Sequence, residues 1–235
     1  MMPTMSRATA FAFRQLGTLR RTCLSRFCKL RLRKRVLWQR NSKVAIDLAF
    51  RRKAVRTLVR EIGCYVLCDL DQVPIYVGQS TDGIRSRVNR HLTSARSDII
   101  ANRQVDVWEI AWVWAYPVED KSMIGPLEDA LFHHFHVKSA LMNGRVPKSA
   151  PSRMQLPKPT QIVQVMSDAE IREKLDPALR LPRQAEHYSQ VVGHFLAVKN
   201  SKEIAFAIQA HFERLQKYHK ILLGFADEIE GDSSD

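Results

Sequence analysis

Five side chains in the middle of the chain carry groups that can move protons, pair with an anion or hold a cation. They are two phenols, a guanidinium, an imidazole and a carboxylate, at Tyr65, Tyr76, Arg87, His91 and Glu128. A phenol or an imidazole can exchange a proton, a guanidinium presents a planar fork of donors to a phosphate, and a carboxylate can bind Mg²⁺. Such a set suits a reaction that activates water and stabilises negative charge next to a bound cation.

A β-hairpin is predicted to bring the two phenols together. Residues 64–70 and 73–78 are rich in Tyr, Val, Ile, Cys and Leu, and Asp71-Gln72 separates them. Tyr65 and Tyr76 would then lie on adjacent strands.

A helix over residues 84–95 is predicted to carry the guanidinium and the imidazole. Its apolar stripe has spacings of four and three residues and consists of Ile84, Val88, Leu92 and Ala95. Arg87 and His91 are four residues apart beside that stripe, so they point the same way.

Residues 105–116 form the strongest strand pattern in the chain. Trp108, Ile110, Trp112 and Trp114 alternate with small or branched residues, so both faces of the strand are largely apolar. The period of two favours core packing of the tryptophans over base stacking. We therefore expect an α+β fold with a small, mainly antiparallel, three-stranded sheet flanked by helices.

The carboxylate lies on the apolar face of a predicted helix over residues 124–138. At about 100° per residue, Glu128 falls between Leu131 and Phe132. A carboxylate on a buried face is costly unless it is paired or binds a cation. A divalent metal ion and a buried arginine are the two partners that these residues leave open.

The order of these motifs resembles the GIY-YIG nuclease family over residues 61–147. Gly63-Cys64-Tyr65 and Tyr76-Val77-Gly78 differ from the two name-giving triplets only by Cys for Ile and Val for Ile. The arginine and histidine, Glu128 and finally Asn143 follow in the family's order.

The resemblance implies a metal-dependent endonuclease that hydrolyses DNA phosphodiester bonds with Mg²⁺ or Mn²⁺. It implies a metal ligand at Glu128 and catalytic roles for Tyr65, Tyr76, Arg87, His91 and Glu128. Substrate binding is expected from a second set, Gly78, Gln79, Ser80, Arg90 and Asn143. A tyrosine would be the base, Tyr65 first and Tyr76 second, and a pKa near 7.5 would require about 3.5 kcal/mol of preference for the anion.

One departure from the family pattern affects the arginine. Thr81-Asp82-Gly83 lengthens the turn before the helix, so Arg85 and Arg90 remain alternatives to Arg87.

The positive charge is concentrated in the N-terminal quarter. Residues 1–60 hold 17 Lys and Arg against the single acid Asp47, whereas residues 61–235 hold 20 against 23. We expect a basic, disordered arm over 1–42, a basic helix over 43–62, the nuclease domain over 63–150 and a helical C-terminal region over 160–235. The first 46 residues contain no acid, which is also typical of a transit peptide or of a start assigned too far upstream.

This organisation is most similar to a restriction or mobile-element enzyme. The alternative is a catalytically inactive DNA-binding or RNA-binding module that uses the basic segment. Double-strand cleavage by a one-site enzyme would require a homodimer or two successive nicks.

The four cysteines, Cys23, Cys28, Cys64 and Cys68, show none of the paired metal-ligand spacings and are interpreted as reduced thiols. No apolar run approaches the roughly 20 residues that a membrane span requires. We expect a cytoplasmic protein that is associated with the nucleoid if the chain is bacterial.

Overall fold

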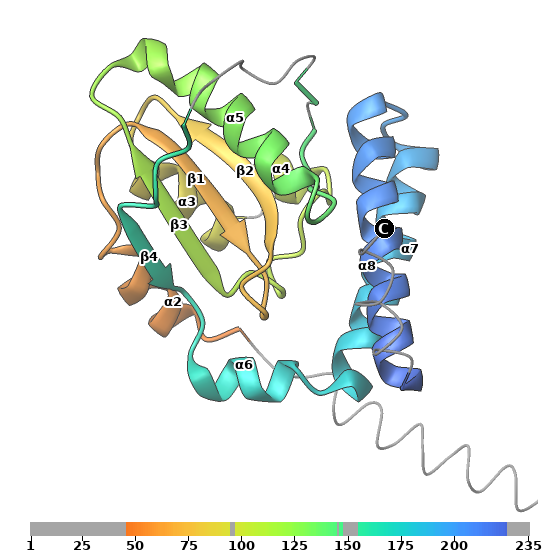
Figure 1. Ribbon diagram of the computed structural model, residues 1–235. Helices are drawn as coiled ribbons and strands as arrows, with labels where there is room; N and C mark the ends of the chain where they lie inside the picture. Colours follow the sequence, from red (N-terminus) through yellow and green to blue (C-terminus); the bar gives the residue numbers. More distant parts are fainter. Residues whose placement is uncertain (1–45, 95–96, 145, 148–154, 225–235) are drawn as a thin grey trace, which may run out of the picture. The chain divides into compact units, whose positions relative to one another are not determined.

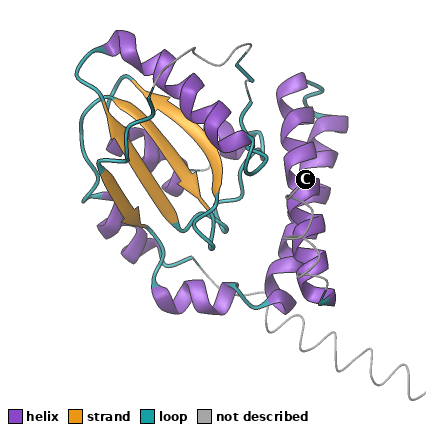
Figure 2. Cartoon of the chain, in the orientation of Figure 1, coloured by secondary structure: helices purple, strands orange, loops and turns teal. Residues whose placement is uncertain are grey.

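A four-stranded antiparallel sheet forms the centre of the described chain, with the strand order β2-β1-β3-β4 (Figures 1 and 2). The structure is a computed structural model that describes residues 46–94, 97–144, 146–147 and 155–224. The arm predicted over residues 1–42 lies outside these ranges. All described residues belong to one unit, Ala45–Asp235.

The first two strands form the predicted hairpin. β1 (Gly63–Cys68) is buried along its whole length and pairs with β2 (Pro74–Ser80), with Tyr65 opposite Gly78. The turn is closed by Asp69, whose backbone N–H donates to the Val73 carbonyl and whose Oδ1 accepts from the N–H of Val73. The hairpin prediction is therefore confirmed.

The third strand is shorter than predicted. β3 is Trp112–Pro117, and residues 105–111 form turns instead of the first half of a strand. Asp106 Oδ1 accepts from the Trp108 N–H at 3.1 Å, which holds a turn there. The buried residues of 105–111 thus enter the core from a loop.

A fourth strand corrects the prediction of a three-stranded sheet. β4 (Gln161–Gln164) pairs with β3 and lies in the segment that was predicted to be helical. It has only four residues, two of them glutamines at its ends, so its sequence lacks an alternating pattern long enough to identify a strand.

Helices cover both faces of the sheet (Figure 1). On one face, Tyr65, Leu67 and Val113 pack with α2 (Leu48–Val55) and α3 (Ile84–Thr93). On the other face, Cys64, Val66 and Val77 pack against α5 (Ile124–His136), which the 3₁₀ turn η1 (Lys121–Met123) precedes. The two faces correspond to alternate residues of β1, as the pleat requires.

The basic helix predicted over 43–62 is only eight residues long. It ends at Val55, and residues 56–62 run as turns and extended chain along the sheet. Gln161 of β4 holds this segment, because its Oε1 accepts from Val59 N–H at 3.0 Å and its Nε2 donates to the Thr57 carbonyl at 2.8 Å. These bonds from the Gln161 side chain satisfy backbone groups that would be hydrogen-bonded within a longer helix.

One arginine of this helix is buried. The Arg51 guanidinium is fully covered and donates to the carbonyls of Val107 at 3.1 Å and Ile110 at 3.0 Å. It thereby joins α2 to the loop before β3. Burial lowers the pKa of Arg51 to about 10.

The C-terminal region is helical after β4. Its helices are α6 (Asp168–Lys174), α7 (Pro177–Ala197) and α8 (Lys202–Leu223). Ser167 caps α6, because its hydroxyl accepts from the Glu170 N–H at 3.2 Å.

A buried ion network joins the last two helices to the hairpin turn. Arg180 of α7 contacts Glu109 and Asp71, and both Arg180 and Arg214 of α8 pair with the buried carboxylate of Asp69. Removing one partner would leave an uncompensated buried charge, so this contact strongly favours the docked position of the helices.

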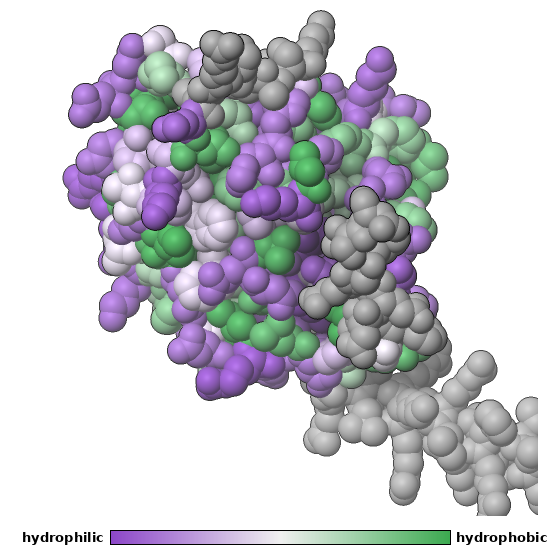
Figure 3. All heavy atoms as spheres, viewed as in Figure 1, coloured by the Kyte–Doolittle hydropathy of each residue, from purple (hydrophilic) through white to green (hydrophobic). Residues whose placement is uncertain are grey.

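The remaining surface and core features are simple. Cys64 and Cys68 are buried free thiols. On the face seen in Figure 3, apolar side chains lie scattered among hydrophilic ones. None of the helices in the described part of the chain has an apolar stretch of the length that a bilayer span requires.

Candidate active site

Tyr65 is held in place by the glycine across the hairpin. Its side chain is fully buried, and a Cβ at Gly78 would lie 2.4 Å from its hydroxyl. The ring therefore needs the space that the absent side chain leaves. Tyr76 follows diagonally on β2, with the two ring centroids 6.4 Å apart. The hairpin thus brings the two phenols together, as the sequence predicts.

His91 of α3 contacts the Tyr65 hydroxyl. The Oη–Nε2 distance is 2.6 Å, and the opposite ring nitrogen, Nδ1, lies 2.5 Å from Ser97 Oγ. The Ser97 hydroxyl lies 3.5 Å from Asp98 Oδ1, to which it donates. Because a carboxylate only accepts, this network assigns the proton of neutral His91 to Nδ1 and leaves Nε2 to accept from the phenol.

Arg87 joins the same group of side chains. Its Nη2 donates to Asp98 Oδ2 at 2.9 Å. Its Nε is buried and has no hydrogen-bond partner among the described residues. Although burial opposes it, the Tyr65 phenol and the Asp98 carboxylate raise the pKa of Arg87. A charged guanidinium therefore lies beside Tyr65 with one donor to spare.

A cavity of about 310 Å³ opens next to these residues. Tyr76 and Glu128 both line it, and Glu128 reaches it from α5 as a half-buried side chain. Three more carboxylates line the cavity, those of Asp98, Asp129 and Glu203. Among the described residues no lysine or arginine lines it. The oxygen-rich lining suits a hard divalent cation.

Both phenols are protonated at neutral pH in this arrangement. Burial raises the pKa of Tyr65 far above its ordinary value, and the neighbouring Tyr76 adds to the effect. Burial also raises the pKa of Tyr76, with Asp98 and Glu128 contributing. Without a metal, Arg87 offsets only part of the cost of burial, so it does not by itself supply the preference for the anion that a phenol pKa near 7.5 would require.

Burial has the opposite effect on the imidazole. It lowers the pKa of His91 to about 4, and the positive charge of Arg87 contributes. His91 is therefore neutral at physiological pH and can accept a proton from Tyr65.

Asn143 lies at the cavity and fixes the edge strand. Its Oδ1 accepts from the Val77 N–H at 3.0 Å, and its Nδ2 donates to the Val77 carbonyl at 2.7 Å. Both groups of the amide are thus used by the backbone of β2. Gln79 is exposed and lines the cavity as well.

Three other residues named from the sequence lie elsewhere. Ser80 is buried and its Oγ donates to the Gly83 carbonyl at 2.9 Å, so it closes the turn before α3. Arg90 is exposed on α3. Arg85 is the alternative to Arg87, but its Nε donates to the Leu58 carbonyl at 2.6 Å and it lines a different pocket. Arg87 is the arginine beside the phenols.

Sequence reasoning missed Ser97, Asp98 and Glu203. Ser97-Asp98 has the pattern of a helix start, and it does begin the short helix α4 (Asp98–Ala101). The loop that returns it to His91 has no sequence signature. Glu203 comes from the first turn of α8, 75 positions after Glu128 in the sequence, and only the docking of that helix places it at the cavity.

The fold thus brings two phenols, an imidazole and an arginine together beside a cavity that Tyr76 and Glu128 line, an arrangement that suits a hydrolytic catalytic domain. The model of the GIY-YIG catalytic domain matches residues 61–133, which contain every element from β1 to most of α5. Residues 61–133 therefore form a GIY-YIG catalytic domain, which is the catalytic domain of an endonuclease. No curated protein and no solved structure matches the chain.

Proposed function

We propose that this protein is a divalent-metal-dependent DNA endonuclease of the restriction or mobile-element type. The observation that carries the proposal is the hydrogen bond between Tyr65 and a neutral His91, next to a carboxylate-lined cavity. The type is argued from the organisation of the chain, in which a small nuclease domain lies between a basic segment and a helical extension.

The cavity fits a Mg²⁺ or Mn²⁺ ion. Among the described residues no three His, Cys, Asp or Glu side chains are grouped closely enough to hold a metal on their own. Mg²⁺ commonly takes one or two carboxylates and completes its shell with water and substrate phosphate, so Glu128 is a sufficient anchor. When bound there, the ion would neutralise charge that develops on the phosphate and on the leaving 3′ oxygen.

Arg87 is suited to contact the scissile phosphate. Asp98 fixes the guanidinium through one nitrogen, and a phosphate oxygen that reached the buried Nε would satisfy a donor that has no partner among the described residues. A hydrogen bond between two charged groups is about twice as strong as a neutral one. The positive charge lies where the phosphorane-like transition state gains negative charge.

The proton of the attacking water follows the hydrogen-bonded chain. As the water oxygen attacks phosphorus, its proton passes to Tyr65 Oη, and the phenolic proton passes to His91 Nε2. The resulting imidazolium donates through Nδ1 to Ser97, whose hydroxyl donates to Asp98. Tyr65 is thus a base only together with His91, and because burial lowers the pKa of His91 to about 4, the negative charge of Asp98 is needed to stabilise the imidazolium.

The test is cleavage of supercoiled plasmid by the full chain with Mg²⁺ or with a chelator. We expect cleavage only with the metal, and we expect Glu128→Gln to reduce the rate on the order of 10²-fold or more while plasmid binding stays within about threefold. Glu119→Gln, an exposed acid in the loop after β3, is the matched control and should cleave like the wild type.

Three outcomes distinguish the alternatives. Full activity of Glu128→Gln would refute the metal site. Binding without cleavage by the wild type would favour the inactive binding module. Appearance of linear DNA before the nicked circle is exhausted would indicate paired sites, as in a homodimer.

A further inference from the structure

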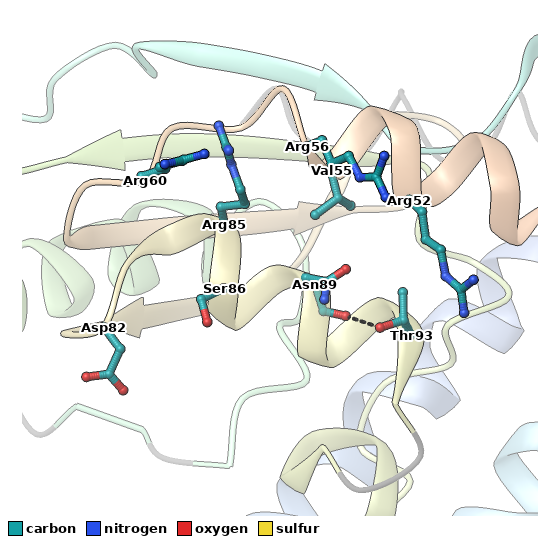
Figure 4. A pocket seen from close by; sticks show the side chains of 9 residues that line it. All are labelled: Arg52, Val55, Arg56, Arg60, Asp82, Arg85, Ser86, Asn89 and Thr93. Carbon is teal, nitrogen blue, oxygen red and sulfur yellow. Dashed lines mark hydrogen bonds between the residues drawn. The ribbon is translucent and has the colours of Figure 1, made fainter.

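A second, strongly basic groove lies on the opposite side of α3 from the catalytic residues. It has a volume of about 710 Å³, and Figure 4 shows its lining side chains. Four arginines line it, Arg52, Arg56, Arg60 and Arg85, against the single carboxylate of Asp82. In Figure 4, Asp82 lies at one end of the groove, away from Arg52 and Arg56.

Three of these arginines follow one another along the groove and form a row of positive charges. Arg52, Arg56 and Arg60 are four residues apart and all exposed. Arg52 lies on α2, Arg56 directly follows it, and Arg60 is in the extended segment that continues along the groove. Exposed Ser86 and Asn89 of α3 form the facing wall and add neutral hydrogen-bonding groups.

The two walls of the groove are fixed to each other by hydrogen bonds. The Arg85 N–H donates to the Val59 carbonyl at 3.2 Å, and the Ile84 N–H donates to the Glu61 carbonyl at 2.9 Å. The Arg85 side chain adds a bond to the Leu58 carbonyl. The backbone that carries the arginines is therefore fixed before binding, so only side chains must be ordered when a ligand with regularly spaced negative charges binds.

The groove supplies positive charge, which the described residues lining the catalytic cavity lack. That cavity is lined by four carboxylates, so without a bound cation it repels phosphate. DNA affinity must therefore come from a basic surface outside it, because phosphate contacts from Lys and Arg provide most of non-specific DNA binding. The arginine groove is such a surface, and it is built on the same helix as Arg87 and His91.

The geometry of α3 relates the two sites. Arg85 and Asn89 each precede a catalytic residue, Arg87 or His91, by two positions, or about 200° around the helix. The sites thus lie one helix diameter apart, roughly 10–12 Å, which equals the rise of about three base pairs. Arg90, exposed between them, lies on the path of a strand that crosses α3.

We propose that the arginine groove between α2 and α3 binds the phosphate backbone of duplex DNA about three base pairs from the scissile bond. This site deepens the endonuclease function proposed above. Its contacts are with phosphates alone, so it contributes affinity and register without reading sequence.

The experiment measures binding of the full chain to a 30-base-pair DNA duplex in EDTA, between 50 and 200 mM KCl. The groove variant is Arg52→Gln/Arg56→Gln/Arg60→Gln. The charge-matched control is Arg172→Gln/Lys199→Gln/Lys217→Gln, three exposed cations of the C-terminal region. The arm before residue 46 is present in both variants, so its contribution cancels in the comparison.

Each phosphate contact that is lost lowers the slope of log K against log salt by about 0.9. We expect the groove variant to lose about 2 to 3 from the slope and to bind at least tenfold more weakly at 50 mM KCl, and the control to lose less than 1. In Mg²⁺ the groove variant should also raise KM for plasmid cleavage. Melting temperatures of both variants establish that they are folded.

The outcomes separate this inference from the proposed activity. A wild-type slope in the groove variant overturns the groove, and so does failure of the wild type to bind DNA. A groove variant that loses affinity for an RNA duplex but binds DNA like the wild type overturns it in favour of RNA. Binding that follows the expected slopes in a protein that does not cleave supports the groove and refutes only the catalytic function.

Discussion

At the scale of single residues, the proposed base is not a phenol alone but Tyr65 hydrogen-bonded to a neutral His91. Tyr65 is fully buried and its pKa is raised, so it cannot act as a free tyrosinate. His91 is also buried, and the same desolvation keeps it neutral with an accepting Nε2. Because burial opposes charge on both groups, a proton transfer to His91 depends on Asp98, whose carboxylate raises the pKa of His91.

Removal of the Tyr65 hydroxyl should abolish most activity. We expect Tyr65→Phe to reduce the cleavage rate by about 10²- to 10⁴-fold, the usual contribution of a positioned acid–base group. Loss of the hydrogen bond leaves His91 Nε2 unpaired and should cost about 1–3 kcal/mol of stability. Plasmid cleavage and urea unfolding check the two effects. Tyr116→Phe, a buried tyrosine in the core cluster under α5, is the control and should cleave normally.

At the scale of elements, the hairpin positions the Tyr65 ring because the residue opposite it has no side chain. The Tyr65 side chain crosses the strand pair and lies over Gly78, where any side chain would collide with it. This contact gives a physical reason for the glycine in Tyr76-Val77-Gly78. The side chain of Asn143 hydrogen-bonds both the N–H and the carbonyl of Val77 on β2. It thereby covers part of the exposed edge of that strand.

Gly78→Ala tests this packing. The added Cβ would lie 2.4 Å from the Tyr65 hydroxyl, so the ring must move. We expect a loss of about 1–3 kcal/mol of stability, which is typical of overpacking, and at least a tenfold loss of cleavage. Gly193→Ala is the control, because nothing lies within 4 Å of the added atom and α7 should gain up to about 1 kcal/mol. Wild-type cleavage by Gly78→Ala would show that Tyr65 does not depend on this contact.

The sequence predicted the elements with strong periodicity and missed those determined by distant contacts. The hairpin, α3 and α5 were evident, because their apolar spacing and turn residues are local. β4 was missed because a four-residue strand is defined by its pairing to β3. The extended strand over 105–116 was overpredicted because Glu109 and Asp106 leave the sheet to bind arginines of α7.

The same distinction applies to the site. Tyr65, Tyr76, Arg87, His91 and Glu128 could be named because each has a distinctive side chain in a recognisable order. Ser97 and Asp98 could not, since their role depends on a loop that returns the chain to His91.

At the scale of the whole molecule, the catalytic domain and the C-terminal helices are joined by buried charges. Asp69 at the hairpin turn pairs with both Arg180 and Arg214, while Tyr218 donates to the same carboxylate at 3.1 Å. The arginines hold the pKa of Asp69 below its usual value even though burial opposes this. The hairpin that carries the phenols is therefore anchored at its turn by helices about 110 to 150 residues later in the sequence.

The molecule should lose stability as the pH falls from 6.5 towards 4. Burial lowers the pKa of His91 to about 4 and that of His211 to about 3, whereas the unfolded chain binds these protons near pH 6.5. The unfolded state then holds more protons, so between pH 7.5 and pH 5 each histidine should lower the free energy of unfolding by about 2 kcal/mol. The paired carboxylate of Asp69 loses its contribution only at lower pH.

Urea unfolding at pH 7.5 and pH 5 measures this loss. His211→Gln should remove about 2 kcal/mol of the pH dependence, because glutamine does not titrate. His219→Gln, at an exposed position of the same helix, should leave the pH dependence as in the wild type. An unchanged pH dependence in His211→Gln would mean that this histidine is not buried in its neutral form.

The central claim is that Tyr65 and His91 act as one proton-transfer unit, and a double-mutant cycle on plasmid cleavage tests it most directly. The rates to compare are those of wild type, Tyr65→Phe, His91→Gln and the combined variant in Mg²⁺. For a single unit, the combined variant should be no slower than the slower single variant, within about threefold. Rate losses that multiply, so that the combined variant is slower by the product of the two single effects, would contradict the account.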